Sequence, residues 1–155
     1  MKLSDYLSEK QIIVGAKSKK KKESLKELLG ALVSLRKISP RSRNKILSSL
    51  MARERLGSTA IGQGVAIPHA RLELVKKSLV VIGLFEEGLE FDSLDGELVY
   101  VVFLILSPKE LEGFHLKMLA TISKLLRDKY FLERLKKSKT ASEISQLIKS
   151  QEERM

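Results

Sequence analysis

The segment 56–70, LGSTAIGQGVAIPHA, is the most informative part of the chain. Its apolar residues, interrupted by glycines, predict a strand, and Pro68 predicts a rigid turn because it fixes φ and lacks a backbone donor. That turn would hold His69 at a strand end. An imidazole, with an unperturbed pKa of about 6.5, can act as a nucleophile or as an acid or base near neutral pH. His69 is one of two histidines in a chain without cysteine, so it is the first candidate for chemistry.

The same segment resembles a known signature. L-G-S-T-x-I-G-x-G-V-A-I-P-H is similar to the phosphorylation site of EIIA domains of the bacterial phosphotransferase system, in the branch of fructose, mannitol and nitrogen-regulatory types. The resemblance implies that His69 accepts a phosphoryl group from phospho-HPr. It further implies that the group passes to an EIIB domain or is held as a regulatory mark. The resemblance covers nearly the whole chain, is sharpest at 53–70, is clear at 111–126 and is weak at 15–45.

Two more residues are carried over from this resemblance. His115 matches a second active-site histidine, which would bond the phosphoryl oxygens or orient His69; its place near a helix start favours anions. Arg53 matches an arginine that precedes L-G-S-T, and a guanidinium offers a fork of donors to phosphoryl oxygens. Arg55 competes for this assignment. Each residue also has an interpretation without a role in function. His115 could simply lie at the edge of the buried face of a helix, and either arginine could interact with the helix dipole at a C-terminus.

Several neighbours of these residues are candidates for minor roles. Ser58 and Thr59 can supply hydroxyl donors, and Gln63 either bonds near the imidazole or is a turn residue that faces water. Glu112 is expected at the rim, where a carboxylate could fix an imidazole tautomer. Apolar residues expected to form or support the walls of a shallow depression around His69 are Ile61, Val65, Ile67, Leu116 and Leu119.

Strand and helix signals alternate along the chain. Apolar runs predict strands at 11–15, 79–85 and 98–106, and the last two are joined too closely for a crossover helix, so they should be antiparallel. Ser39-Pro40 and Ser107-Pro108 are read as helix starts, and residues 140–143 form a capping box. We therefore expect an α/β fold in one domain over residues 1–155, with a mixed, about five-stranded sheet flanked by helices.

The composition excludes several classes of function. The chain of 155 residues has 43% hydrophobic residues and no cysteine, so it fits a globular domain without a disulfide scaffold or thiolate metal site. Two distant histidines make a poor zinc site, and no P-loop or G-x-S-x-G elbow is present. We expect no metal and no cofactor, and ATP is not the expected phosphoryl donor.

The net charge of +10 permits binding to anions, but only 5% of residues are aromatic and tryptophan is absent. Specific nucleic-acid binding is therefore not expected. The lysine-rich run at 17–22 is either a solvated turn that leads into a helix or a patch for polyanions. Because HPr proteins generally present a basic docking surface, a basic EIIA is unexpected. Either acidic residues cluster around the histidines, or docking relies on apolar contact.

These observations leave three hypotheses for function. The first is a phosphocarrier for uptake of sugars of the fructose or mannitol class. The second is a stand-alone nitrogen-type regulator that binds target proteins according to its phosphorylation. The third is a non-catalytic module that contacts polyanions through residues 17–22 and 41–43. No segment reaches the roughly 20 apolar residues of a membrane helix, so we expect a cytoplasmic protein that meets a membrane only through a transporter.

Overall fold

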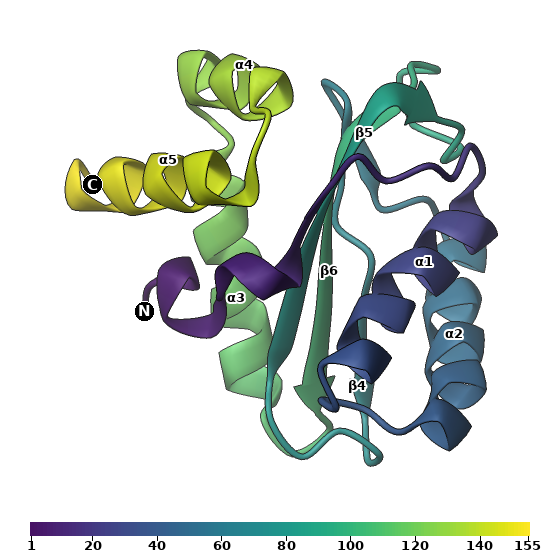
Figure 1. Ribbon diagram of the computed structural model, residues 1–155. Coiled ribbons are helices and arrows are strands. Elements are labelled where there is room, and N and C mark those ends of the chain that lie inside the picture. Colours follow the sequence, from purple (N-terminus) through teal and green to yellow (C-terminus); the bar gives the residue numbers. More distant parts are fainter.

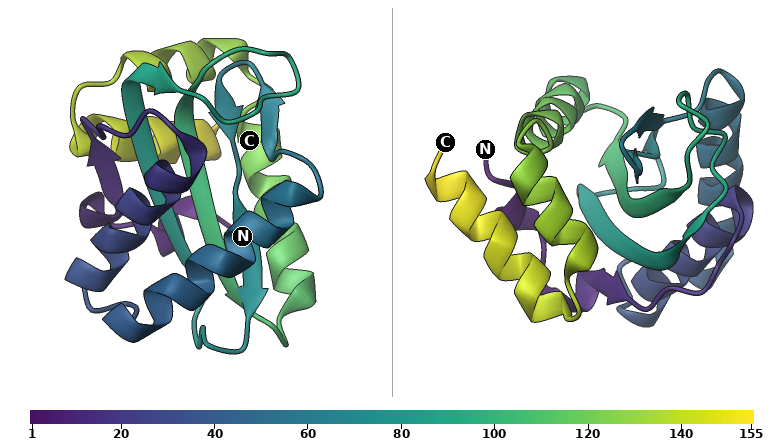
Figure 2. Two further views of the ribbon diagram at one scale, coloured as in Figure 1. Left: turned by 90° about the vertical axis from the view of Figure 1, so that its right-hand side faces the viewer. Right: turned by 90° about the horizontal axis from the view of Figure 1, so that it is seen from above.

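A mixed β-sheet separates two layers of helices in the computed structural model, which describes residues 1–155 (Figure 1). Helices α1 and α2 cover one face, and α3, α4 and α5 lie on the other, with the N-terminal 3-10 helices η1 and η2 beside them (Figure 2). The bounds of these elements are η1 Leu3–Tyr6, η2 Glu9–Gln11, α1 Lys21–Ser34, α2 Pro40–Arg55, α3 Glu112–Leu125, α4 Lys129–Lys137 and α5 Ala141–Glu153.

The sheet has six strands in the order β1-β5-β6-β3-β2, and β4 also pairs with β6. β5 and β6 are antiparallel as expected, whereas β1 pairs in parallel with β5, and both β3 and β4 pair in parallel with β6. The prediction of a mixed sheet between helices is therefore confirmed, with six strands in place of about five. Their bounds are β1 Ile12–Val14, β2 Ala60–Gly62, β3 Val65–Ala66, β4 His69–Leu72, β5 Leu79–Leu89 and β6 Val99–Pro108.

The uninterrupted apolar run of β6 is explained by burial on both faces. Val101, Phe103 and Ile105 belong to the core cluster under α3, α4 and α5. Val102 and Leu104, which point to the opposite face because side chains alternate along a strand, belong to the cluster under α1 and α2. The central strand therefore supports both cores and fixes the position of every element that pairs with it.

The helix signals are confirmed at two of the three predicted starts. Ser39 caps α2 by accepting a hydrogen bond from the Ser42 backbone N–H, and Thr140 caps α5 in the same way. The start predicted at Ser107-Pro108 is wrong, because β6 continues to Pro108 and α3 begins at Glu112. Parallel pairing with β4 extends the strand, and a proline is tolerated in its last residue.

The segment 56–70 forms three short strands and not the single strand that we predicted. Positive φ angles at Gln63 and Gly64 reverse the chain between β2 and β3, which pair as a hairpin. Pro68 follows, and His69 is the first residue of β4. The imidazole therefore stands at the start of a strand whose direction is set by β6.

One residue of the lysine-rich run has a structural role that its sequence does not indicate. The Lys21 ammonium, at the start of α1, lies 3.0 Å from the buried Glu54 carboxylate and 3.2 Å from Asp92. Glu54 also accepts hydrogen bonds from the backbone N–H and the hydroxyl of Thr59. This network joins α1 to the end of α2 and to the residues that precede β2.

We expect Lys21→Met to lower the free energy of unfolding by about 2 kcal/mol, because it leaves the Glu54 carboxylate buried with its Thr59 bonds but without its cation. Lys22→Met is the matched control, since Lys22 is exposed and makes no ion pair, and it should change stability by less than about 0.5 kcal/mol. Urea denaturation at neutral pH measures both. Equal effects of the two substitutions would show that Lys21 contributes nothing specific.

Candidate functional site

His69 is held by its backbone and by one hydrogen bond. The Pro68 carbonyl accepts a hydrogen bond from Ile105 of β6, at 3.0 Å, which ties the start of β4 to the central strand. The His69 Nδ1 atom lies 2.7 Å from the Ile67 carbonyl oxygen. A carbonyl oxygen only accepts, so Nδ1 carries the proton in the neutral ring. The Nε2 atom is then the ring nitrogen with a free lone pair.

His115 lies beside His69, with ring centroids 5.3 Å apart and ring planes at 53°. It comes from the first turn of α3 and is buried. Its Nδ1 atom lies 2.8 Å from the hydroxyl of Ser107, which is fully buried in β6 and makes no other side-chain hydrogen bond. A buried hydroxyl needs an acceptor for its proton, and His115 Nδ1 is the one partner of this hydroxyl. The hydroxyl therefore donates to Nδ1, and the ring proton of neutral His115 resides on Nε2.

Burial keeps both histidines neutral. Desolvation lowers the pKa of His69 below 6.5, and the positive charge of Arg53 lowers it further, against the opposing effects of the Ile67 hydrogen bond and Glu54. Desolvation also lowers the pKa of His115 to about 4, with contributions from His69 and Arg71. At neutral pH the pair therefore offers one free lone pair and one N–H donor.

The two rings line a depression of about 410 Å³ between β4, α2 and α3. Three cationic side chains line it as well, from Arg53, Arg71 and Lys109, and Glu112 supplies a carboxylate. The site can therefore neutralise a small anion held against the two imidazoles. The structure thus brings together all three residues that the sequence singled out, namely Arg53, His69 and His115.

The choice between the two arginines follows from the helix geometry. Arg53 lines the depression of the histidines, and its guanidinium donates to the Gly57 carbonyl at 2.8 Å. Arg55 lies two residues further along α2 and lines a separate groove between α1 and α2. Residues two apart on a helix point in different directions, so only Arg53 is near the imidazoles.

Most of the other neighbours predicted for minor roles lie outside the depression. The hydroxyls of Ser58 and Thr59 are donated to the Phe91 carbonyl and to Glu54. Gln63 is the exposed turn residue of the β2–β3 hairpin, and its backbone N–H donates to Asp95. Among the expected apolar residues, Leu116 and Leu119 line the depression, whereas Val65 and Ile67 belong to the core and Ile61 is exposed on β2.

Glu112 lies at the rim as expected, but it does not fix an imidazole tautomer. Its carboxylate lies 3.7 Å from the Arg71 guanidinium. The hydrogen bond to His115 Nδ1 is made by the Ser107 hydroxyl instead. Ser107 was missed because Ser-Pro was read as a helix start. Arg71 could have been found, since it stands two residues after His69 and therefore on the same side of β4.

Two acidic side chains lie next to cations of the depression. Glu112 pairs with Arg71, and Glu73 lies 3.8 Å from Lys109. Leu111 and Leu116, at the start of α3, are 47% and 61% exposed. The rim therefore carries both acidic and exposed apolar side chains, and both explanations of the basic chain remain hypotheses. No group of three or more histidine, aspartate and glutamate side chains is placed to hold a metal ion.

If the site transfers phosphoryl groups as the sequence resemblance implies, Ser107→Ala should slow that transfer about tenfold, because loss of the hydroxyl frees the His115 ring to change its tautomer and orientation. Nitrogen chemical shifts of His115 should report a mixture of tautomers in the variant and a single Nε2–H form in the unchanged protein. Ser107→Thr retains the hydroxyl and should preserve the single tautomer. A rate loss without any change of tautomer would assign Ser107 to packing alone.

Comparison with known proteins places this chain in a family. Residues 5–151 match the model of the "Phosphoenolpyruvate-dependent sugar phosphotransferase system, EIIA 2" family. A nitrogen regulatory protein of Bradyrhizobium diazoefficiens is 34% identical over 148 residues, which span 96% of this chain and 95% of that protein. The crystal structure of the nitrogen regulatory protein IIA-Ntr from Neisseria meningitidis superposes with a TM-score of 0.85 at 31% identity, covering 94% of this chain and 98% of that one.

A third relative is larger. The fructose-specific EIIABC component of Bacillus subtilis is 29% identical over 148 residues, which span 96% of this chain but only 23% of that protein. Together the matches show that this chain belongs to the type 2 EIIA family of the phosphotransferase system. Members of this family are phosphotransfer components. None of the helices is both long and apolar enough to cross a membrane.

Proposed function

We propose that this chain is a phosphocarrier that accepts a phosphoryl group from phospho-HPr on Nε2 of His69 and passes it to an EIIB domain. The observation that carries the proposal is the bond from His69 Nδ1 to the Ile67 carbonyl, which leaves Nε2 as the nucleophilic nitrogen in a cationic depression. The chain would act as one EIIA domain in the cytoplasm. The fructose-specific relative, an EIIABC component, supports an EIIB domain as acceptor.

The transfer needs positioning and neutralisation of charge. The Nε2 lone pair forms the new N–P bond as the N–P bond of the donor histidine breaks, and the electron pair of that bond returns to the donor ring. Phosphoryl transfer has a loose, in-line transition state with charge on the equatorial oxygens. Arg53, Arg71 and the Nε2–H of His115 would stabilise that charge, and the buried setting strengthens their effect.

The low pKa values predict how the reaction depends on pH. Because neutral His69 is the nucleophile and its pKa is lowered, acceptance should be nearly constant above about pH 7.5 and should decline at a lower pH than it would for a free imidazole. The folded pKa of His115 is about 4. The unfolded chain therefore binds protons first as pH falls from 6.5 towards 4, and stability is lost in that window. An NMR titration of both rings checks this; a His69 pKa at or above 6.5 would contradict it.

A stand-alone nitrogen-type regulator is the second candidate, and one observation favours it. The nitrogen regulatory proteins of Bradyrhizobium diazoefficiens and Neisseria meningitidis match this chain over almost their whole length, whereas the fructose-specific relative matches over a small part of its own. The sequence alone favoured sugar uptake. Transfer from the phosphorylated chain to a fructose-type EIIB domain would support the transport role. Binding of a target protein by only one phosphorylation state, without such transfer, would support the regulator.

The decisive test is the intact mass after incubation with phosphoenolpyruvate, enzyme I and HPr. The proposal expects a gain of one phosphoryl group that is lost in acid, as a phosphoramidate is. No gain with donors that phosphorylate another EIIA would overturn the carrier role. Binding of a polyanion that weakens steeply with salt, together with no gain of mass, would then support the module that acts through residues 17–22 and 41–43.

A further inference from the structure

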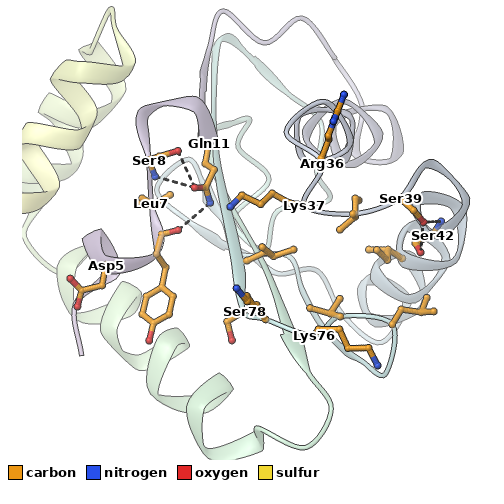
Figure 3. A pocket seen from close by; sticks show the side chains of 17 residues that line it. Asp5, Leu7, Ser8, Gln11, Arg36, Lys37, Ser39, Ser42, Lys76 and Ser78 are labelled. Carbon is orange, nitrogen blue, oxygen red and sulfur yellow. Dashed lines mark hydrogen bonds between the residues drawn. The ribbon is translucent and has the colours of Figure 1, made fainter.

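A second cleft, of about 790 Å³, lies away from the histidines (Figure 3). Three segments that are distant in the sequence line it: residues 5–11, the connection between α1 and α2, and the connection between β4 and β5. None of its lining residues lines the depression at His69. Its volume falls in the range of about 300–1,000 Å³ that is usual for sites of small molecules.

The cleft is strongly cationic. Arg36, Lys37, Lys76 and Lys77 line it, against a single carboxylate from Asp5. None of these four cations takes part in an ion pair, although seven pairs form elsewhere in the chain. The Lys37 side chain extends toward the side of Gln11 (Figure 3). Unneutralised charges around a concave surface raise the local concentration of anions.

The cleft also offers neutral donors and a rigid wall. The Ser78 hydroxyl oxygen is shielded from solvent and has no hydrogen-bond partner, which leaves one unsatisfied polar atom beneath the lining. On the same side, the Gln11 amide donates to the carbonyls of Tyr6 and Val80 at 3.1 and 2.9 Å and accepts from Ser8. This wall is fixed without any ligand, so binding would require little ordering.

Apolar side chains complete the lining, with Ile38, Ile46 and Leu79 among them. A purely inorganic anion would leave this surface in contact with water, so an occupant with an apolar body gains more from burial. Four cations against one carboxylate leave an excess of three positive charges. Such an excess suits a dianion better than a monocarboxylate, because each additional ligand charge meets an unpaired cation.

We propose that this cleft binds a small organic phosphate that carries an apolar or aromatic group. The phosphate would meet the cationic lining, to which Lys37 and Lys77 contribute, and the organic body would cover the apolar lining. This site is independent of the phosphocarrier role, because it shares no residue with the depression at His69.

The test uses the fluorescent aromatic sulfonate 1-anilinonaphthalene-8-sulfonate as the probe, with phenyl phosphate, benzoate and inorganic phosphate as competitors. Phenyl phosphate should displace the dye at a concentration at least about tenfold lower than benzoate or inorganic phosphate. The double substitution Lys37→Gln/Lys77→Gln should weaken phenyl phosphate at least tenfold. Lys22→Gln/Lys26→Gln removes the same charge from the separate groove between α1 and α2 and should change affinity less than twofold.

Two further measurements locate the ligand. His69→Ala should bind phenyl phosphate as the unchanged protein does, which separates this cleft from the phosphoryl site. Amide shifts on titration should change in residues 8–11 and 74–79. Three outcomes would each overturn the proposal. The first is an equal loss of affinity in the two double-lysine variants, the second is a loss of affinity in His69→Ala, and the third is no displacement of the dye by phenyl phosphate.

Discussion

His69→Ala is expected to abolish phosphoryl acceptance, with a rate loss of more than about 10³-fold. The substitution removes the only atom that we assign as nucleophile, and the neighbouring His115 cannot replace it. Its ring is buried, and its Nδ1 accepts from Ser107, so its remaining nitrogen carries a proton. Intact mass and acid lability of the product, after incubation with phosphoenolpyruvate, enzyme I and HPr, measure the effect.

Arg55→Gln is the control for this experiment, because Arg55 lies at the same end of α2 but outside the depression. It should accept the phosphoryl group at the rate of the unchanged protein. Thermal unfolding of His69→Ala should stay cooperative, since the ring is only partly buried at the surface of the fold. Phosphorylation that persists in His69→Ala would show that another residue is the acceptor, and His115 would be tested next.

Leu104→Ala should be the most damaging of the substitutions directed at the fold. Leu104 is fully buried in β6, the strand that pairs with β3, β4 and β5. Truncating it removes apolar contacts and leaves a cavity, and we expect a loss of about 3–4 kcal/mol in the free energy of unfolding. In a domain of this size that corresponds to a fall of about 10 °C in Tm.

Leu94→Ala makes the same chemical change at a residue that is 76% exposed, and it should shift stability by less than about 0.5 kcal/mol. Urea unfolding of both variants, with equal m-values, checks the comparison. A loss below 1 kcal/mol in Leu104→Ala would mean that the sheet and its helices collapse around the missing side chain. Burial of β6 on both faces would then contribute less to the free energy of unfolding than we infer.

Local sequence patterns determined the fold class and most of the elements. The run at 98–106 is apolar throughout, which is the pattern of a strand buried on both faces. Ser39-Pro40 and Thr140 marked helix starts through hydrogen bonds that span three residues. The segment 56–70 likewise singled out His69, because Pro68 fixes its own φ directly before it and the glycines permit the positive φ angles of a tight turn.

The tertiary structure decided everything that depends on which strands are neighbours. Ser107 and Pro108 looked like a helix start until pairing with β4 made them the end of a strand, and only that pairing delivers the Ser107 hydroxyl to His115. The choice of Nε2 on His69 likewise rests on one backbone contact to Ile67. Helix caps act over a few residues and can be read from the sequence. Strand register and the contact of Ser107 with His115 join separate segments. The bond of His69 to Ile67 is close in the sequence, but it forms only in the backbone conformation that the pairing of β4 with β6 holds in place.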